Sequence, residues 1–173
     1  MYTNSFLGEF SKHAPCVGSG VEIAPSLISS DGSGCGLFTT RPFRKGSVVT
    51  WYDGVLLWAT RLLDKKRGEY HHKTHWRAVQ GMDMVIQGLR SEGDGLLTGR
   101  GGGSIINHNL QRQNCRLANS KHRIDMWCES DHLMYNVVAV VVEATRDIAA
   151  NEELYCDYGS GVWIHDFFIN GND

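Results

Sequence analysis

The sequence predicts a mainly β protein with short helices, folded as one domain. From Val21 onward, short apolar runs alternate with glycine-bearing turns, which is typical of strands joined by tight connections. Val, Ile, Tyr and Trp, the residues that favour strands, are concentrated in these runs. A chain of 173 residues with 42% hydrophobic composition can bury one sizeable core, so we expect a single domain.

The predicted strands follow one another along the chain and should form several small sheets. The apolar run at 134–144 could also be helical, but its many β-branched valines favour a strand. The best helix candidate is the short, charged segment Trp58–Glu69, where Leu62 and Leu63 are the only strong core anchors. The strands are expected at 21–24, 36–40, 47–52, 54–57, 82–88, 104–107, 122–127, 134–144 and 153–158.

The two ends and one long loop lack regular periodicity. Residues 1–20 are rich in Ser, Gly, His and Pro, which predicts an N-terminal arm. Residues 89–103 contain too many glycines for a regular element, and loops of this length are commonly functional or mobile. We therefore expect the domain proper at 21–158, followed by a separate C-terminal segment at 159–173.

Charge and cysteine content exclude several classes of protein. Seventeen Lys and Arg against nineteen Asp and Glu give a net charge of −2, so the broad basic field of a nucleic-acid-binding protein is missing. The five cysteines are odd in number and form no CxxC pair, which argues against a disulfide framework or a zinc site. No basic and apolar leader opens the chain and no apolar run could cross a bilayer, so we expect an intracellular protein away from membranes.

Histidines at positions 71, 72 and 75 are the remaining candidates for metal binding. His71 and His75 have the spacing that can bind a metal from one face of a helix. No carboxylate or cysteine at a suitable spacing accompanies them, so a solvated polar segment is the better interpretation. The sequence predicts no metal site.

Two short motifs could carry ligand chemistry. Gly34-Cys35-Gly36 would let a ligand approach the backbone closely, although a hairpin turn explains the same glycines. Asn107-His108 directly follows two isoleucines, so both side chains are expected at the edge of the core, where polar groups need partners. They either cap neighbouring backbone or offer amide and imidazole groups to a polar ligand.

The segment that ends at Tyr158 is the third candidate. On a strand, alternation puts Cys156 and Tyr158 on one face, with Tyr155 and Asp157 on the other. Two side chains of one face could line a channel and place a phenol in it. The alternatives are a half-buried tyrosine of an edge strand and a core-packing cysteine.

Taken together, these motifs and Tyr52-Asp53-Gly54, in their order along the chain, resemble the SET-domain protein lysine methyltransferases. The resemblance covers roughly 21–163 and implies a fold of several small curved sheets with a C-terminal pseudoknot. It implies an insert at about 59–103 that reads the substrate, and a C-terminal segment that closes the site. It also implies S-adenosylmethionine as methyl donor, S-adenosylhomocysteine as product, and no zinc-binding cysteine clusters flanking the domain.

The resemblance also implies roles for individual residues. The catalytic tyrosine would be Tyr158, and Tyr52 would line the channel for the acceptor lysine. Cys156 would stand where the family often has Phe or Tyr, which leaves room for more than one methyl group. The donor would be bound by Gly34, Cys35, Gly36, Asn107, His108 and Trp163, with Phe167 and Phe168 as further aromatic candidates.

Two departures from the family pattern keep an alternative open. The segment between Asn107 and Asn114 is one residue longer than usual and lacks its proline, and Ser104 replaces a common arginine. An inactive SET-like module that binds a peptide or partner is therefore an alternative to the enzyme, as is a methyltransferase for a non-histone or non-lysine acceptor. The expected partner is a lysine-bearing protein or peptide, with a histone tail as one candidate. The expected location is the nucleus if the protein is histone-directed and otherwise the cytoplasm.

Overall fold

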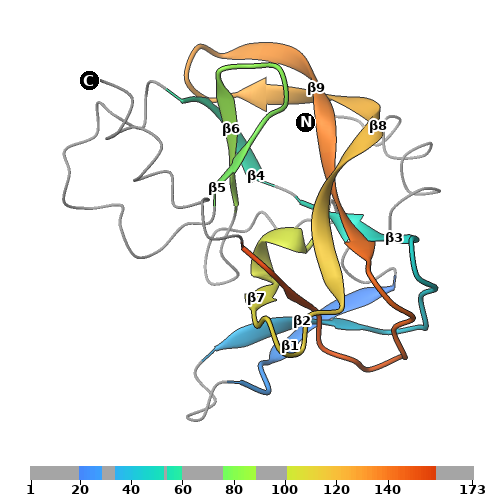
Figure 1. The fold of residues 1–173 in the computed structure, drawn as a ribbon. Helices are drawn as coiled ribbons and strands as arrows, with labels where there is room; N and C mark the ends of the chain where they lie inside the picture. The colour runs from blue at the N-terminus through green and yellow to red at the C-terminus, as the bar shows by residue number, and fades with distance from the viewer. Residues whose placement is uncertain (1–19, 29–33, 53, 60–75, 89–100, 159–173) are drawn as a thin grey trace, which may run out of the picture.

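The computed structural model describes residues 20–28, 34–52, 54–59, 76–88 and 101–158, and these residues are mainly β as predicted (Figure 1). They form three sheets and one short 3₁₀ helix. The elements are β1 (Val21–Pro25), β2 (Cys35–Thr39), β3 (Val48–Trp51), β4 (Gly54–Trp58), β5 (Trp76–Ala78), β6 (Met84–Gly88), η1 (Gly103–Ile105), β7 (Asn107–His108), β8 (Cys115–Cys128), β9 (Leu133–Ala144) and β10 (Tyr155–Cys156).

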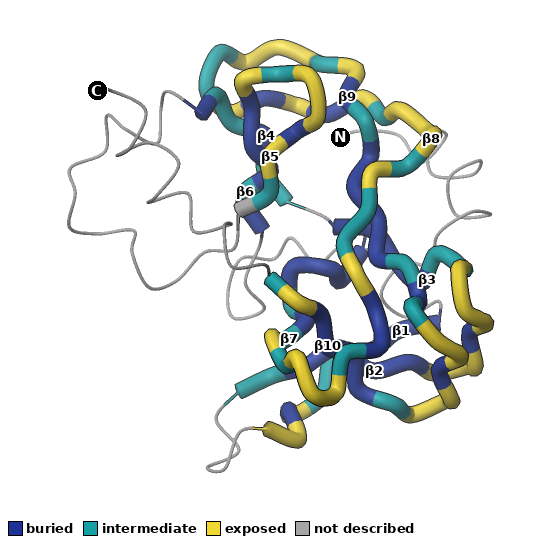
Figure 2. The backbone as a smooth tube through the Cα atoms, viewed as in Figure 1, coloured by how far each residue is buried: buried dark blue, intermediate teal, exposed yellow. Residues whose placement is uncertain are grey.

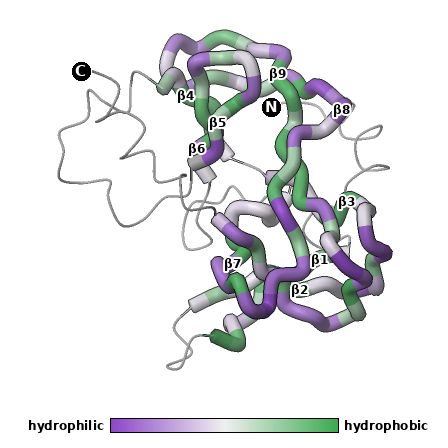
Figure 3. The backbone as a smooth tube through the Cα atoms, viewed as in Figure 1, coloured by the Kyte–Doolittle hydropathy of each residue, from purple (hydrophilic) through white to green (hydrophobic). Residues whose placement is uncertain are grey.

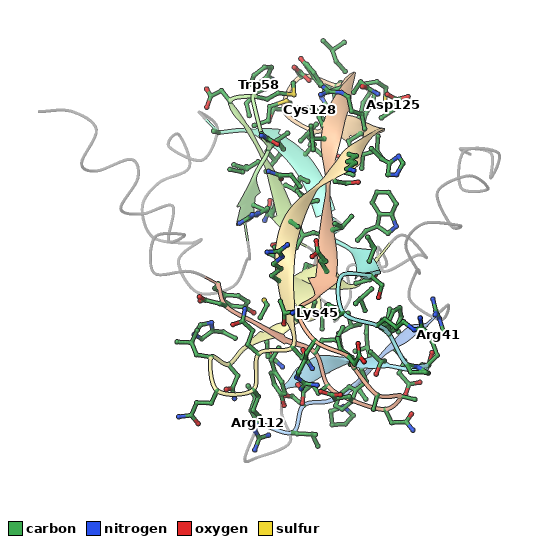
Figure 4. All side chains as sticks on the ribbon, turned by 45° about the vertical axis from the view of Figure 1, so that its right-hand side comes forward. Arg41, Lys45, Trp58, Arg112, Asp125 and Cys128 are labelled. Atoms are coloured by element: carbon green, nitrogen blue, oxygen red, sulfur yellow. The ribbon has the colours of Figure 1, made fainter. Side chains whose placement is uncertain are left out.

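The largest sheet has six strands in the order β3-β9-β8-β4-β6-β5 and is held together by the long antiparallel pair β8 and β9. The valine-rich β9 confirms the strand predicted at 134–144, and its middle is buried (Figure 2) and hydrophobic (Figure 3). The pair connects the two ends of the molecule. Trp58, Asp125 and Cys128 lie at one end, while Arg41 and Arg112 lie at the other, beside the two small sheets (Figure 4).

The two small sheets bring together segments that are far apart in sequence. β1 pairs with β2 in an antiparallel hairpin, and β10 pairs with β7 in a parallel sheet. The backbone of β10 is bonded on both edges: Asn109 N–H donates to the Cys156 carbonyl at 3.3 Å, and Asn114 N–H to the Tyr155 carbonyl at 3.1 Å. β10 therefore passes between two parts of one loop, which is the pseudoknot that the resemblance to SET domains implies.

Two buried clusters support the two ends of the fold. One lies under the small sheets and includes Leu37, Ile106 and Cys156. The other lies under the six-stranded sheet and includes Tyr52 and Leu56. Tyr52 and Cys156 thus belong to different clusters, and Leu117 packs against both clusters.

The structure contradicts some local predictions, and several others lie outside the described residues. Trp58 does not begin a helix: it ends β4, pairs with Met84, and its indole N–H donates to Asp131 Oδ2 at 2.7 Å. The predicted strand at 104–107 is a 3₁₀ turn followed by β7, because its backbone bends toward β10. The rest of the helix candidate, the N-terminal arm up to residue 19, the histidines at 71, 72 and 75, most of the insert and the C-terminal segment lie outside the described residues.

Candidate functional site

Tyr158 lies against His108, as the proposed site requires. The two rings have centroids 5.2 Å apart and are tilted by 45°, and the Tyr158 backbone N–H donates to His108 Nδ1 at 3.1 Å. The Tyr158 phenol donates to the Ile106 carbonyl. His108 Nδ1 also lies 3.9 Å from Asp157 Oδ1.

Tyr52 is brought to the same place from another sheet. It is 6% exposed, and its backbone N–H donates to the Val140 carbonyl at 2.9 Å. Burial raises the pKa of the Tyr52 phenol well above its ordinary value, and the Cys156 thiol adds to this effect. Burial also raises the pKa of Tyr158, with further contributions from Cys156 and Tyr52. The two tyrosines and the thiol are therefore within electrostatic range of one another, and both phenols remain protonated donors.

Cys156 is the third buried side chain of this arrangement, and it contributes to the raised pKa of both tyrosines. The regular strand ends at Cys156 and not at Tyr158, yet both side chains pack on the core cluster under the small sheets, as the alternation predicted. Burial, together with the Asp157 carboxylate, raises the pKa of the thiol to about 12. Cys156 is thus a neutral, 1% exposed side chain at neutral pH, with no thiolate character.

Asn107 meets the glycine motif of the β1–β2 hairpin. Its amide nitrogen donates to Ser26 Oγ at 3.0 Å, to the Cys35 carbonyl at 3.1 Å and to Glu153 Oε1 at 3.1 Å. Because the Cys35 carbonyl and the Glu153 carboxylate only accept hydrogen bonds, the amide nitrogen must face them. The amide oxygen is then turned the other way, as an acceptor. Asn107 is half-buried, whereas His108 is more exposed than the sequence predicted.

Glu153 is the residue of this region that the sequence analysis missed. It is 1% exposed and accepts four hydrogen bonds, with Asn107 as one donor. Burial raises the pKa of the carboxyl, but the bonds from Ser26, Tyr155, Leu27 and Asn107 outweigh it and hold the pKa below its ordinary value. The other three donors are Ser26 Oγ at 2.6 Å, Leu27 N at 2.7 Å and the Tyr155 hydroxyl at 2.6 Å.

Gly36 is a glycine because of Glu153. A Cβ atom at Gly36 would lie 2.2 Å from Glu153 Oε1, so no larger residue fits beside the carboxylate. The glycine motif is therefore partly explained by packing within the protein. Gly34 and Cys35 directly precede it in the sequence, and Trp163 lies outside the described residues.

Asn114 holds the pseudoknot despite the unusual turn before it. Its Nδ2 donates to the Glu153 carbonyl at 2.8 Å and its Oδ1 accepts the Tyr155 N–H at 2.9 Å. The turn lacks the proline of the family pattern, and Asn109 Oδ1 stabilises it by accepting the N–H groups of Gln111 and Arg112, both at 3.1 Å. The extra residue is absorbed in this turn, so β7 and β10 still pair in register.

The fold and the site define a SET domain. The family model for the SET domain matches residues 34–159, which is more than half of the chain, and the chain belongs to this family. No curated protein sequence matches it.

Two solved structures with the same fold belong to the ctPRC2 complex. One is ctPRC2 in an autoinhibited conformation bound to S-adenosylmethionine, with a TM-score of 0.51 and 21% sequence identity over 84% of this chain. The other is apo ctPRC2 with mutations in Ezh2, with a TM-score of 0.51 and 19% identity over 80% of this chain. In both cases this chain covers 15% of the neighbour, so the likeness is one of fold.

Among the described residues, no group of three or more His, Cys, Asp or Glu side chains could hold a metal ion. In the same part of the chain, no helix is long and apolar enough to cross a membrane.

Proposed function

We propose that this protein is an S-adenosylmethionine-dependent protein lysine N-methyltransferase. The observation that carries the proposal is the meeting of the Tyr158 phenol, the Ile106 carbonyl and the His108 ring with Tyr52 and Cys156. Membership of a family whose members are generally protein lysine methyltransferases supports the same conclusion.

S-adenosylmethionine supplies the methyl group as an electrophilic carbon, which the neutral amine attacks as the C–S bond breaks and S-adenosylhomocysteine leaves. Catalysis is then mainly positioning. A free lysine has a pKa of about 10.4, and desolvation by the buried walls of Tyr52 and Cys156 favours its neutral form. The phenol oxygens and the Ile106 carbonyl orient the amine and the methyl group through weak C–H···O contacts of about 0.5–1 kcal/mol each.

The groups around Asn107 fit a cationic donor. Glu153 and the Cys35 carbonyl hold the amide nitrogen of Asn107, so its amide oxygen points outward. This oxygen can accept a hydrogen bond from the ammonium group of S-adenosylmethionine. The backbone of Gly34 and Cys35 and the ring of His108 complete the proposed donor site, with Trp163 as its proposed cover. Nothing in this set requires a metal.

Cys156 favours multiple methylation. A cysteine is much smaller than the Phe or Tyr common at this position in the family, so the channel beside Tyr52 and Tyr158 holds room for a methylated amine. We propose that di- or trimethyllysine is formed. The acceptor would be a lysine-bearing protein or peptide, with histone tails as the first candidates and the nucleus as the corresponding location; a non-histone acceptor would place the protein in the cytoplasm.

The experiment combines a binding and a transfer assay on the same sample. Calorimetry with S-adenosylhomocysteine and transfer of labelled methyl groups to core histones and to cell lysate should both be positive. Tyr158→Phe should retain binding and transfer methyl groups more slowly. Binding without transfer to any acceptor would support an inactive, partner-binding SET module, for which the replacement of an arginine by Ser104 is the main argument. Absence of donor binding would refute the proposal.

A further inference from the structure

Arg77 is a positively charged side chain in an unexpected position. It lies on β5, the edge strand of the six-stranded sheet, and pairs with Ile86 of β6, which in turn pairs with Leu56 of β4. Directly paired residues of neighbouring strands point to the same face of a sheet. Leu56 and Ile86 are fully buried in the core cluster that contains Tyr52, so Arg77 projects toward this cluster from its edge.

The neighbours of Arg77 along the strand agree with this direction. Val79, two residues further on, points the same way and belongs to the same buried cluster. The next pair of β4 and β6 on this face, in the direction of Tyr52, is Gly54 with Gly88. Glycines have no side chain, so this pair places no side chain between Arg77 and Tyr52. Arg77 itself is half-buried, and in the described part of the chain no carboxylate forms an ion pair with it.

Electrostatic effects at two other residues point to the same location. Burial is the main cause of the raised pKa of Tyr52 and of Cys156, and at both groups the Arg77 guanidinium acts in the opposite direction. Tyr52 and Cys156 come from different sheets, and the Arg77 guanidinium lies within electrostatic range of both. These two side chains line the acceptor channel of the proposed function.

We infer that Arg77 is a positioning residue of this channel, whose guanidinium disfavours a second positive charge beside Tyr52 and Cys156 and thereby favours the neutral, nucleophilic form of the acceptor lysine. The inference rests on the proposed function. A guanidinium keeps its charge across the physiological pH range. A lysine that enters as an ammonium therefore meets a like charge in a partly desolvated site, whereas the neutral amine does not.

The test compares two ligands of the donor site that differ by one charge. S-adenosylhomocysteine is a neutral thioether, and sinefungin carries an ammonium where the transferred methyl group would be. Arg77→Leu should tighten sinefungin by about fivefold relative to S-adenosylhomocysteine at neutral pH. Arg77→Gln should act in the same way, and Arg77→Lys, which retains the charge, should leave the ratio of the two dissociation constants at its wild-type value.

The affinity for S-adenosylhomocysteine reports whether each variant is folded, and Arg116→Leu on β8 is the control for loss of a cation elsewhere. Arg116 is exposed and paired with Glu143 at 2.9 Å, so its removal should not change the ratio. If both ligands bind and neither neutral variant changes the ratio, the role of Arg77 is refuted and the proposed function stands. If neither ligand binds to the wild-type protein, the proposed function and the role of Arg77 are refuted together.

Discussion

Removal of the Glu153 carboxylate should destabilise the protein strongly, because this group joins three segments that are distant in sequence. Its Oε1 accepts from Ser26 and Asn107, and its Oε2 accepts from the Leu27 N–H and the Tyr155 hydroxyl. In Glu153→Ala the two hydroxyls can turn to other acceptors, but the remaining donors lose a charged acceptor in a buried setting. We expect a loss of about 3 kcal/mol in the free energy of unfolding.

Urea denaturation of Glu153→Ala beside Glu143→Ala provides the measurement and its control. Glu143 forms an exposed ion pair with Arg116 at 2.9 Å, and such pairs contribute about 0–1 kcal/mol. A loss for Glu153→Ala no larger than that of the control would show that the four hydrogen bonds do not hold the hairpin to the pseudoknot.

The lowered pKa of Glu153 predicts how the stability of the protein changes with pH. Hydrogen bonds hold the pKa of Glu153 in the folded protein below its ordinary value of 4.5. A carboxyl group with a lowered pKa in the folded state stabilises the protein above its unfolded-state pKa and loses this effect as the pH falls through the folded-state value. The stability difference between wild type and Glu153→Ala should therefore be constant at neutral pH and shrink below about pH 4.5, and a difference that grew on acidification would contradict the assignment.

Three further substitutions test the site and its support. Tyr158→Phe removes the phenol that donates to the Ile106 carbonyl, and we expect roughly tenfold slower methyl transfer, from two lost contacts of about 0.5–1 kcal/mol each, with unchanged affinity for S-adenosylhomocysteine. Cys156→Phe should shift the products toward monomethyllysine in mass spectra, and an unchanged product distribution would mean that other residues limit the channel. Gly36→Ala places a Cβ 2.2 Å from Glu153 Oε1 and should cost about 1–3 kcal/mol in urea denaturation, whereas wild-type stability would show that the carboxylate moves freely.

The strands could be predicted because their side chains carry the information locally. The valines of β9 favour an extended backbone, and their burial in the six-stranded sheet matches their hydrophobicity. Trp58 misled the prediction because the charged residues after it suggest a helix, while its own partners, Met84 and Asp131, come from other parts of the chain. Local propensity contains no information about such partners.

In the candidate site, too, local patterns were predictable from the sequence, whereas contacts between distant segments were not. The motifs around Asn107 and Tyr158 were recognisable as short patterns, and the structure brings them together. Glu153 was not recognisable, because a glutamate before an apolar strand is ordinarily exposed. Only the meeting of the β1–β2 hairpin with β7 and β10 supplies the donors that allow its charge to be buried.

Arg77 extends this argument to the chemistry. In the sequence it follows Trp76 in a polar stretch, where an arginine normally faces solvent. Its direction is fixed by strand register, since a shift of one residue in the pairing with Ile86 would turn the guanidinium to the opposite face. The positive charge that acts on the acceptor channel thus depends on the pairing between β5 and β6. This pairing is far in sequence from Tyr158. Substitutions that shift this pairing should therefore change the ratio of the dissociation constants for sinefungin and S-adenosylhomocysteine. They should leave the affinity for S-adenosylhomocysteine itself unchanged.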